Sequence, residues 1–194
     1  MKKETLEKIR TIKHLKFGEV SIPGTVGRVG YNLVLLTREC VNDPHIVRLL
    51  GRWRKKHEFW FPSQFPVSFG RTRVWLQQRV IDEPDRLLCM IRVHDTYIGH
   101  VGLYRFDFKT GTCEIDNIVR GRREYPGIIA SAISLMMSWG TRELGLKGYT
   151  LETTSDNEKA LKLYKSLGFE ESKRVKTENR YTVFMKRKGE YETK

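Results

Sequence analysis

The chain has 194 residues with 36 Lys or Arg against 23 Asp or Glu, so its formal net charge is +13 at pH 7. This length suits one domain with one core, and an apolar share of 39% favours a folded chain. No run of 18 apolar residues exists, and no apolar segment follows the lysine-rich start. We therefore expect neither a membrane helix nor a signal peptide, and we predict a cytoplasmic protein.

The three cysteines, Cys40, Cys89 and Cys113, lack the spacing and partners of a disulfide framework or a zinc site, so no metal is expected. The positive charge attracts anions, which makes nucleic acid one candidate partner. Because the basic residues are scattered and accompany no recognisable nucleic-acid-binding motif, we favour a solvated surface that attracts a phosphorylated ligand.

The first part of the chain predicts two helices and one strand. Residues 2–16 carry apolar side chains at roughly three-residue steps, which indicates a short docked helix. Residues 18–30 are rich in Gly and Pro and predict an irregular connection before a strand at 31–37. Asp43 followed by Pro44 is typical of a helix start, and we expect this helix to end near Lys55.

The middle and the end of the chain predict a sheet. A short helix at 71–80 precedes three strands that form an antiparallel meander, at 87–93, 97–106 and 112–119. Three more strands are expected, at 147–153, 169–176 and 181–186, the last two joined by a turn near Asn179. The predicted fold class is α+β, with a mixed, mostly antiparallel sheet flanked by helices.

Two helices with clear ends flank the strand at 147–153. The first follows Pro126, has an apolar face at three- and four-residue steps, and ends at Gly145. The second opens with Ser155 and Glu158 at the spacing of a capping box, and Gly168 closes it.

The turn before the first of these helices carries Arg120, Arg122 and Arg123. A strand that feeds a helix through such a turn leaves backbone N–H groups unpaired at the helix N-terminus, which favours an anion. A diphosphate is the natural ligand. An ordinary turn with solvated arginines is the alternative.

Asn157, Ala160, Tyr164 and Gly168-Phe169 follow one another at fixed steps along the second of these helices. Together with motifs around the turn, this pattern resembles the GNAT superfamily of N-acetyltransferases, and it matches the family's downstream motif in full. Upstream, Arg122 and Gly127 match the acetyl-CoA motif, although Tyr125 replaces its first glycine. Glu114-Ile115-Asp116-Asn117 also stands where the subgroup for protein N-termini, polyamines and amino sugars has Glu-Ile-Gly-Tyr.

The resemblance implies a single acetyltransferase domain over residues 29–194 after a basic extension over 1–28, with a GNAT-like sheet that splays at its centre. It also implies acetyl-CoA as co-substrate and an amine as acceptor. The pantetheine arm would pair with backbone at Ile118, Val119 and Arg120. The remaining expected cofactor-binding residues are Arg122, Gly127, Ile128, Ile129 and Asn157, although Asn157 has helix capping as an alternative role.

Direct transfer needs a base for the amine and an acid for the departing thiolate. Glu114 or Asp116, which alternate to the same strand face, is the expected base. Tyr164 is the expected acid, because a phenol stays protonated at neutral pH. A tyrosine on an apolar helix face also suits a purely structural role in the core.

The acceptor site is expected in the aromatic connection after the helix that begins at Asp43, with Trp53, Arg54 and Phe59 as substrate-binding residues. Its rings also suit a hydrophobic plug on the core. The pattern is similar to acetyltransferases acting on nucleotide-linked amino sugars, which we predict as the acceptor class. A protein amine is the second candidate, and a basic binding module without acetyl transfer, which the replaced glycine would favour, is the third. A homodimer is among the assemblies to consider.

Overall fold

The computed structural model describes residues 2–61, 66–177 and 180–188, and its centre is an eight-stranded sheet. The α-helices are α1 (Lys2–Lys13), α2 (Pro44–Lys56), α3 (Phe69–Leu76), α4 (Ile128–Leu144) and α5 (Glu158–Ser166). The strands are β1 (Ser21–Val26), β2 (Val29–Leu35), β3 (Leu87–Val93), β4 (Thr96–Asp107), β5 (Thr112–Arg120), β6 (Gly148–Thr154), β7 (Glu170–Lys176) and β8 (Tyr181–Lys188). Short helical turns occupy Arg38–Asn42, Glu58–Trp60 and Gln77–Ile81.

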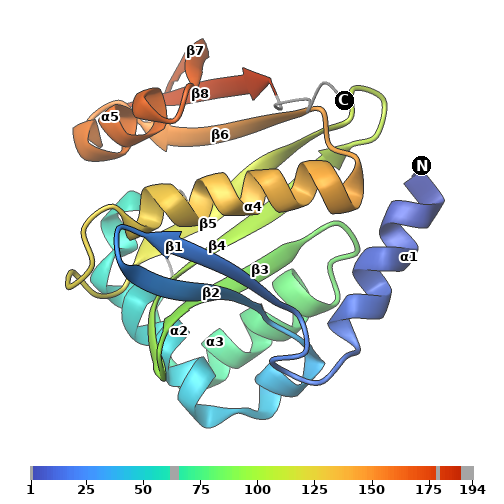
Figure 1. Cartoon of the computed structure of the whole chain (residues 1–194). Coiled ribbons are helices and arrows are strands. Elements are labelled where there is room, and N and C mark those ends of the chain that lie inside the picture. The colour runs from blue at the N-terminus through green and yellow to red at the C-terminus, as the bar shows by residue number, and fades with distance from the viewer. Residues whose placement is uncertain (1, 62–65, 178–179, 189–194) are drawn as a thin grey trace.

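The sheet has the strand order β1-β2-β3-β4-β5-β6-β8-β7, and each neighbouring pair is antiparallel except β5 and β6. These two central strands run parallel and pair over three positions only, of which Glu114 opposite Thr150 is the last. Beyond that pair β5 continues to Arg120 and β6 to Thr154 without further pairing to each other. Figure 1 shows the two strands diverging. The predicted α+β fold with a splayed mixed sheet is confirmed.

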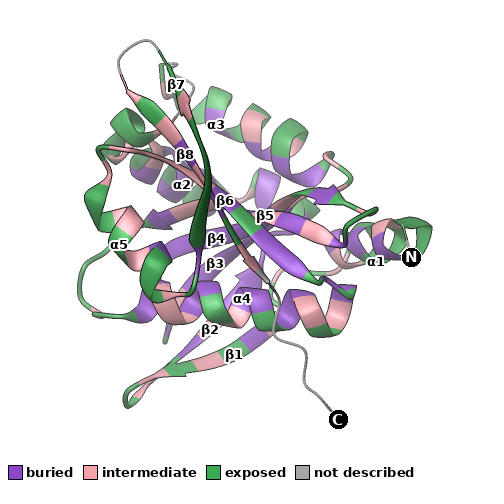
Figure 2. Ribbon diagram, turned by 90° about the horizontal axis from the view of Figure 1, so that it is seen from above, coloured by how far each residue is buried: buried purple, intermediate pink, exposed green. Residues whose placement is uncertain are grey.

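Helices cover both faces of the sheet, and each face has its own apolar core. One core lies under α4 and α5 and includes Leu33, Ile133 and Phe169. The other lies under α2 and α3 and includes Leu50, Trp53 and Leu76. Because both faces are covered, the central strands β3 and β4 are buried along most of their length, as Figure 2 shows. Removing one large side chain from such a core costs about 2–5 kcal/mol.

Helix α4 forms where its apolar periodicity predicts. Gly127 precedes it with φ of 80° and Gly145 follows it with φ of 67°, so both ends use the left-handed conformation that suits glycine. None of the helices in the described ranges is long and apolar enough to cross a membrane.

The expected irregular connection at 18–30 is wrong, because strand β1 occupies Ser21–Val26 and pairs with β2 in register. Pro23 is tolerated because β1 is an edge strand. Gly24 is needed because a Cβ there would lie 2.6 Å from Cζ of Tyr31. The domain boundary at residue 28 stays a prediction, and β1 and β2 pair across it.

The start of α5 also differs from the expected capping box. Asn157 is the N-cap, and its Oδ1 accepts a hydrogen bond from the Ala160 N–H at 3.3 Å. Ser155 instead pairs with Tyr181 of β8, through its N–H at 2.8 Å and its Oγ at 3.3 Å. Asn157 is therefore seen in the capping role that the sequence left open.

The helix expected at 71–80 is confirmed with shifted ends, since α3 begins at Phe69 and continues into a π-turn over Gln77–Ile81. Pro62, Phe65 and the turn at Asn179 lie outside the described residues. Lys13 fixes α1 to this part of the fold, because its Nζ donates to the carbonyl oxygens of Val80 and Ile81 at 2.8 and 3.2 Å.

Candidate active site

The candidate site lies where β5 and β6 separate, and a β-bulge stands on each side of Glu114. In β5, three residue steps from Asp116 to Val119 oppose two steps in β4, and Asn117 has φ of 49°. In β4, three steps from Tyr104 to Asp107 oppose two steps in β5, and Arg105 has φ of 51°. Bulges of this kind turn a side chain out of the regular alternation.

Glu114 is largely buried, with a side chain 14% exposed, and its Oε2 accepts a hydrogen bond from Arg105 Nη1 at 3.0 Å. Burial raises the pKa of the Glu114 carboxyl to about 7, and the negative charges of Glu152 and Asp116 act in the same direction. The Arg105 guanidinium acts against this shift. A carboxyl that titrates near neutral pH suits a general base.

Asp116 is held differently, because it forms an ion pair with Arg86 in which both side chains are less than one-fifth exposed. Asn117 Nδ2 also donates to the Asp116 carboxylate at 2.7 Å. The Arg86 guanidinium in turn lies over the Tyr104 ring at 4.2 Å. These contacts occupy the Asp116 carboxylate, so of the two predicted carboxylates Glu114 is better placed to act as the base.

Tyr164 projects from α5 into the core beneath β6 and is 7% exposed. Its ring meets that of Phe169 at 6.4 Å between centroids. Burial raises the pKa of the phenol well above its ordinary value, so Tyr164 keeps its proton at neutral pH. The residue thus belongs to the core and also retains the proton that an acid must supply.

The arginines of the turn before α4 have distinct positions. The Arg120 guanidinium donates to the carbonyl oxygens of Arg122 and Arg123 at 3.1 and 2.7 Å, so Arg120 shapes the turn from within. Arg122 is exposed and pairs loosely with Glu124 at 3.5 Å. The turn is fixed on the sheet by the N–H groups of Gly121 and Arg122, which both donate to the carbonyl oxygen of Ile98.

The start of α4 offers backbone donors at the place where the sequence predicts a diphosphate. Gly127 is the N-cap and makes no side-chain capping bond. Within the described part of the chain, Ile128 N–H donates to the Tyr125 carbonyl oxygen alone, at 3.4 Å. The first-turn N–H groups of a helix, here including that of Ile129, have no acceptor within the helix.

The free edge of β5 offers backbone groups at the place predicted for the pantetheine arm. Val119 and Arg120 pair with His100 and Gly99 of β4 on one side. On the other side, no described strand pairs with β5 beyond Glu114. An extended ligand can add to such an edge as a further strand, and Ile118 is included in it.

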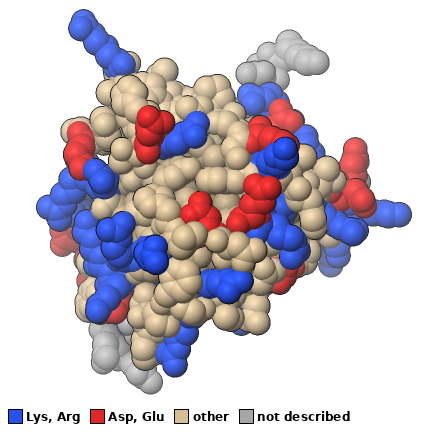
Figure 3. Space-filling view, turned by 90° about the horizontal axis from the view of Figure 1, so that it is seen from below, with Lys and Arg blue, Asp and Glu red and all other residues tan. Residues whose placement is uncertain are grey.

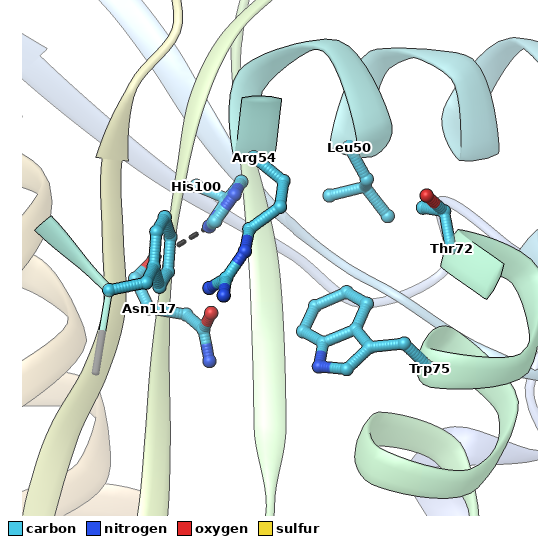
Figure 4. Close-up of a pocket in the computed structure, with 7 residues that line it drawn as sticks. Leu50, Arg54, Thr72, Trp75, His100 and Asn117 are labelled. Atoms are coloured by element: carbon cyan, nitrogen blue, oxygen red, sulfur yellow. Dashed lines mark hydrogen bonds between the residues drawn. The ribbon is translucent and has the colours of Figure 1, made fainter. Parts of the chain in front are cut away.

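A pocket opens beside Asn117, between α2, α3 and the sheet, as Figure 4 shows. Its lining combines apolar, cationic and neutral polar side chains, namely Leu50, Arg54, Phe61, Thr72, Trp75, His100 and Asn117. The Arg54 guanidinium stacks on the Phe61 ring at 3.7 Å and points between Asn117 and Trp75. His100 Nδ1–H donates to the Asn117 carbonyl oxygen at 2.6 Å, and burial lowers the pKa of His100 to about 4.

Two of the residues expected in the acceptor wall lie elsewhere. Trp53 is 5% exposed and packs against His100 at 5.8 Å, so its ring belongs to the core beneath the pocket. Phe59 is 60% exposed and meets the edge of Trp60 at 4.9 Å. Arg180 crosses from the β7–β8 connection to Phe59, donating to its carbonyl oxygen at 3.2 Å and stacking at 5.1 Å from its ring. Of the three residues, only Arg54 lines the pocket.

Sequence reasoning missed several residues that the fold brings to the site. His100, Arg105, Thr72 and Trp75 were given no role in the site, and the bulge at Asn117 was not predicted. One signal was present, since Asn tolerates the left-handed conformation better than most residues. A bulge at Arg105 has no such signal.

Comparison with known proteins supports the resemblance seen in the motifs. A sequence model of the family described as "Acetyltransferase (GNAT) domain" matches residues 34–170. The comparison with curated protein sequences found no significant match.

Solved structures share the fold. A spermidine N-acetyltransferase from Vibrio cholerae, solved with CoA and spermine, superposes with a TM-score of 0.67 at 17% identity, over 82% of this chain and 95% of that one. RimL, a ribosomal L7/L12 alpha-N-protein acetyltransferase solved with coenzyme A, gives 0.68 at 13% identity, over 86% and 97%. Because the family match spans well over half of the sequence, the chain belongs to the GNAT acetyltransferases, with acetyl-CoA as its co-substrate.

Proposed function

We propose that this protein transfers acetyl directly from acetyl-CoA to the primary amine of a small-molecule or nucleotide-linked amino sugar. The observation that carries the proposal is the pocket beside Asn117, where a cation and two aromatic rings meet neutral hydrogen-bonding groups. This pocket adjoins the bulge next to Asp116, whose carboxylate Asn117 contacts. The acceptor and the acetyl group would meet between this pocket and the split between β5 and β6.

The co-substrate would extend along β5. Backbone groups of Ile118, Val119 and Arg120 are suited to the amide-containing pantetheine arm, since that edge of β5 has no strand partner among the described residues. The diphosphate would lie at the start of α4, on the N–H groups of Gly127, Ile128 and Ile129 with Arg122 nearby. The turn that Arg120 holds from within supports this arrangement.

Glu114 is the proposed base and Tyr164 the proposed acid. The acceptor reaches the enzyme as an ammonium ion and passes one proton to the Glu114 carboxylate, directly or through a water molecule. The amine nitrogen then bonds to the thioester carbonyl carbon, the C–S bond breaks, and Tyr164 supplies a proton to the leaving sulfur. The second proton that the nitrogen loses as the amide forms restores the Tyr164 phenol. The raised pKa of Glu114, about 7, and the burial of Tyr164 support these roles.

The pocket chemistry favours a sugar nucleotide over a polycationic acceptor. Among the described residues, those that line it include Arg54 but no carboxylate. Aromatic faces such as those of Phe61 and Trp75 stack on sugars and bases, and a guanidinium binds phosphate. The net charge of +13 suits two anionic ligands. Figure 3 shows the lower face of the molecule, where basic side chains surround a few acidic ones.

A protein amine is the second candidate, because the fold is shared with a ribosomal-protein acetyltransferase. A basic N-terminus or a polyamine would need carboxylates in the acceptor wall, and the short connection after α2 contributes only Glu58 among its described residues. The homodimer stays a prediction.

A free-thiol release assay tests the proposal. Purified protein and acetyl-CoA are incubated with amino sugars, nucleotide-linked amino sugars, polyamines and peptides, and the kcat/KM values are ranked. We expect nucleotide-linked amino sugars to rank first. If peptides or polyamines rank first, the acceptor assignment is overturned while acetyl transfer stands, and if no amine releases CoA the enzyme assignment for this site fails.

A further inference from the structure

The bulge in β4 places Arg105 on one face of the sheet, whereas regular alternation would place it on the opposite face. Tyr104 is paired with Glu114, so these two side chains share a face, and Phe106 lies in the core on the other face. In a regular strand Arg105 would point into that core with its neighbours across the sheet. The inserted residue and the φ of 51° turn Arg105 back toward Glu114 instead.

The left-handed backbone conformation of Arg105 costs free energy. A residue with a Cβ in the left-handed region is disfavoured by about 1 kcal/mol, and Arg lacks the short polar side chain that eases the cost for Asn or Asp. Water screens the Arg105 side of its contact with Glu114, because the Arg105 side chain is 59% exposed, so the contact returns little stability. The placement of Arg105 is therefore better explained by the site than by the fold.

Arg105 has two carboxylates within reach, one on each of the strands that separate. Its Nη1 lies 3.0 Å from Glu114 Oε2 on β5 and 3.8 Å from Glu152 Oε1 on β6. The Arg105 side chain is 59% exposed, which leaves it free to shift between them. The neighbouring Arg86–Asp116 pair contrasts with this, because its side chains are 11% and 19% exposed.

The charges of the cluster leave room for one more cation. Glu114, Asp116 and Glu152 carry three negative charges when ionised, and Arg86 and Arg105 carry two positive ones. Tyr104 is the neutral member, with Arg86 over its ring at 4.2 Å and Arg105 at 5.4 Å. An ammonium ion beside Glu114 would complete the balance.

We propose that Arg105 is a positioning residue, an inference that rests on the proposed function. Arg105 keeps Glu114 ionised until the acceptor arrives, and it moves to Glu152 when the ammonium group of the acceptor takes its place beside Glu114. Arg105 touches no reacting atom in this scheme. It prepares the base and then makes way for the group that the base deprotonates.

The test follows the charge state of Glu114 directly, by carbon-13 NMR of labelled glutamate carboxyl groups across pH, assigned with Glu114→Gln. Arg105→Gln should raise the Glu114 midpoint by about 1 pH unit, because a nearby cation favours the carboxylate. Arg105→Lys keeps the charge and should leave the midpoint near the wild-type value. Arg142→Gln, which removes an equally exposed guanidinium paired with Glu143, is the matched control and should leave it unchanged.

Glu152→Gln separates the second half of the scheme. Removing a like charge should lower the Glu114 midpoint, opposite to Arg105→Gln, and should raise the acceptor KM several-fold because Arg105 has lost its second partner. An unmoved midpoint in Arg105→Gln, or an unchanged KM in Glu152→Gln, overturns the proposal. If the midpoints move as expected but no amine is acetylated, the acetyl-transfer assignment fails while the control of Glu114 by Arg105 stands.

Discussion

His57 Nε2 lies 3.0 Å from the carbonyl oxygen of Arg120, which joins the C-terminal end of α2 to the last residue of β5. Lys56 adds a second link, from its Nζ to the Gly121 carbonyl oxygen at 3.1 Å. The helix that carries Arg54 is therefore bonded to the turn proposed for acetyl-CoA.

Loss of this link should weaken acetyl-CoA binding. His57→Ala removes one hydrogen bond, for which about 1 kcal/mol is typical, so we expect the Kd for acetyl-CoA in calorimetry to rise about 5-fold. Lys55→Ala, at an exposed position of the same turn, is the control. Equal affinities in both variants would mean that the turn keeps its shape without His57.

Tyr164→Phe should lower kcat about 100-fold or more, since general acid catalysis contributes on the order of 10²–10⁴. The ring remains, and among the described residues no partner accepts a hydrogen bond from the hydroxyl, so the melting temperature should change little. Thiol release and thermal denaturation measure the two effects. A variant that melts much earlier with normal turnover would leave Tyr164 only its structural role.

The rate should depend on pH through Glu114. Its carboxyl titrates at about 7, and only the ionised form accepts a proton, so kcat/KM should rise about tenfold per pH unit below 7 and level off above it. Glu114→Gln should remove this dependence along with most of the activity. A flat wild-type profile between pH 5 and 8 argues against Glu114 as the base.

The same shift predicts a change in stability of known sign. The pKa of Glu114 is raised on folding from 4.5 to about 7, so the folded state favours the protonated form. Its contribution is fully present below pH 4.5 and is lost as the pH rises through 7. Glu114→Gln should therefore flatten the decline in melting temperature between pH 5 and pH 8, and a decline equal to that of wild type would refute this linkage.

Substitution of Trp53 should lower stability, whereas substitution of the adjacent Arg54 should weaken acceptor binding. Trp53→Ala empties a buried site and should cost about 3–5 kcal/mol of unfolding free energy, measured by denaturant titration. Arg54→Ala should raise the acceptor KM and leave acetyl-CoA affinity nearly unchanged, with the exposed Arg52→Ala as control. A normal acceptor KM in Arg54→Ala would remove the pocket from the acceptor site.

Local patterns predicted those elements whose residues follow a regular period. The apolar steps of α4 and the Asp43-Pro44 start of α2 suffice because each signal lies within one turn of the helix it describes. Strand β1 was missed because its Pro and Gly are tolerated only at an edge, and edge position is a property of the whole sheet.

The parts of the site that depend on bulges were beyond such patterns. Counting in twos places Arg105 in the core, and only the pairing of β4 with β5 reveals the inserted residue. The predicted substrate-binding role of Trp53 was wrong for a related reason, since its neighbours His100 and Gly121 lie far from it in sequence. Glu114, Asp116 and Tyr164 were named from the family resemblance, and their catalytic roles stay predictions.

The short pairing of β5 with β6 also divides the sheet into two units that differ in their stability against local unfolding. Within the sheet, strands β6, β7 and β8 are joined to the remaining five by three residue pairs. Contacts with α4, the Arg105–Glu152 pair and the bond from Arg180 to Phe59 also link the two units. Few shared hydrogen bonds mean that the smaller unit can open without the larger one, so its amide hydrogens should exchange with deuterium sooner than those of β2 to β4. Acetyl-CoA held between the units should slow that exchange, because the bound co-substrate would contact both units and oppose their separation.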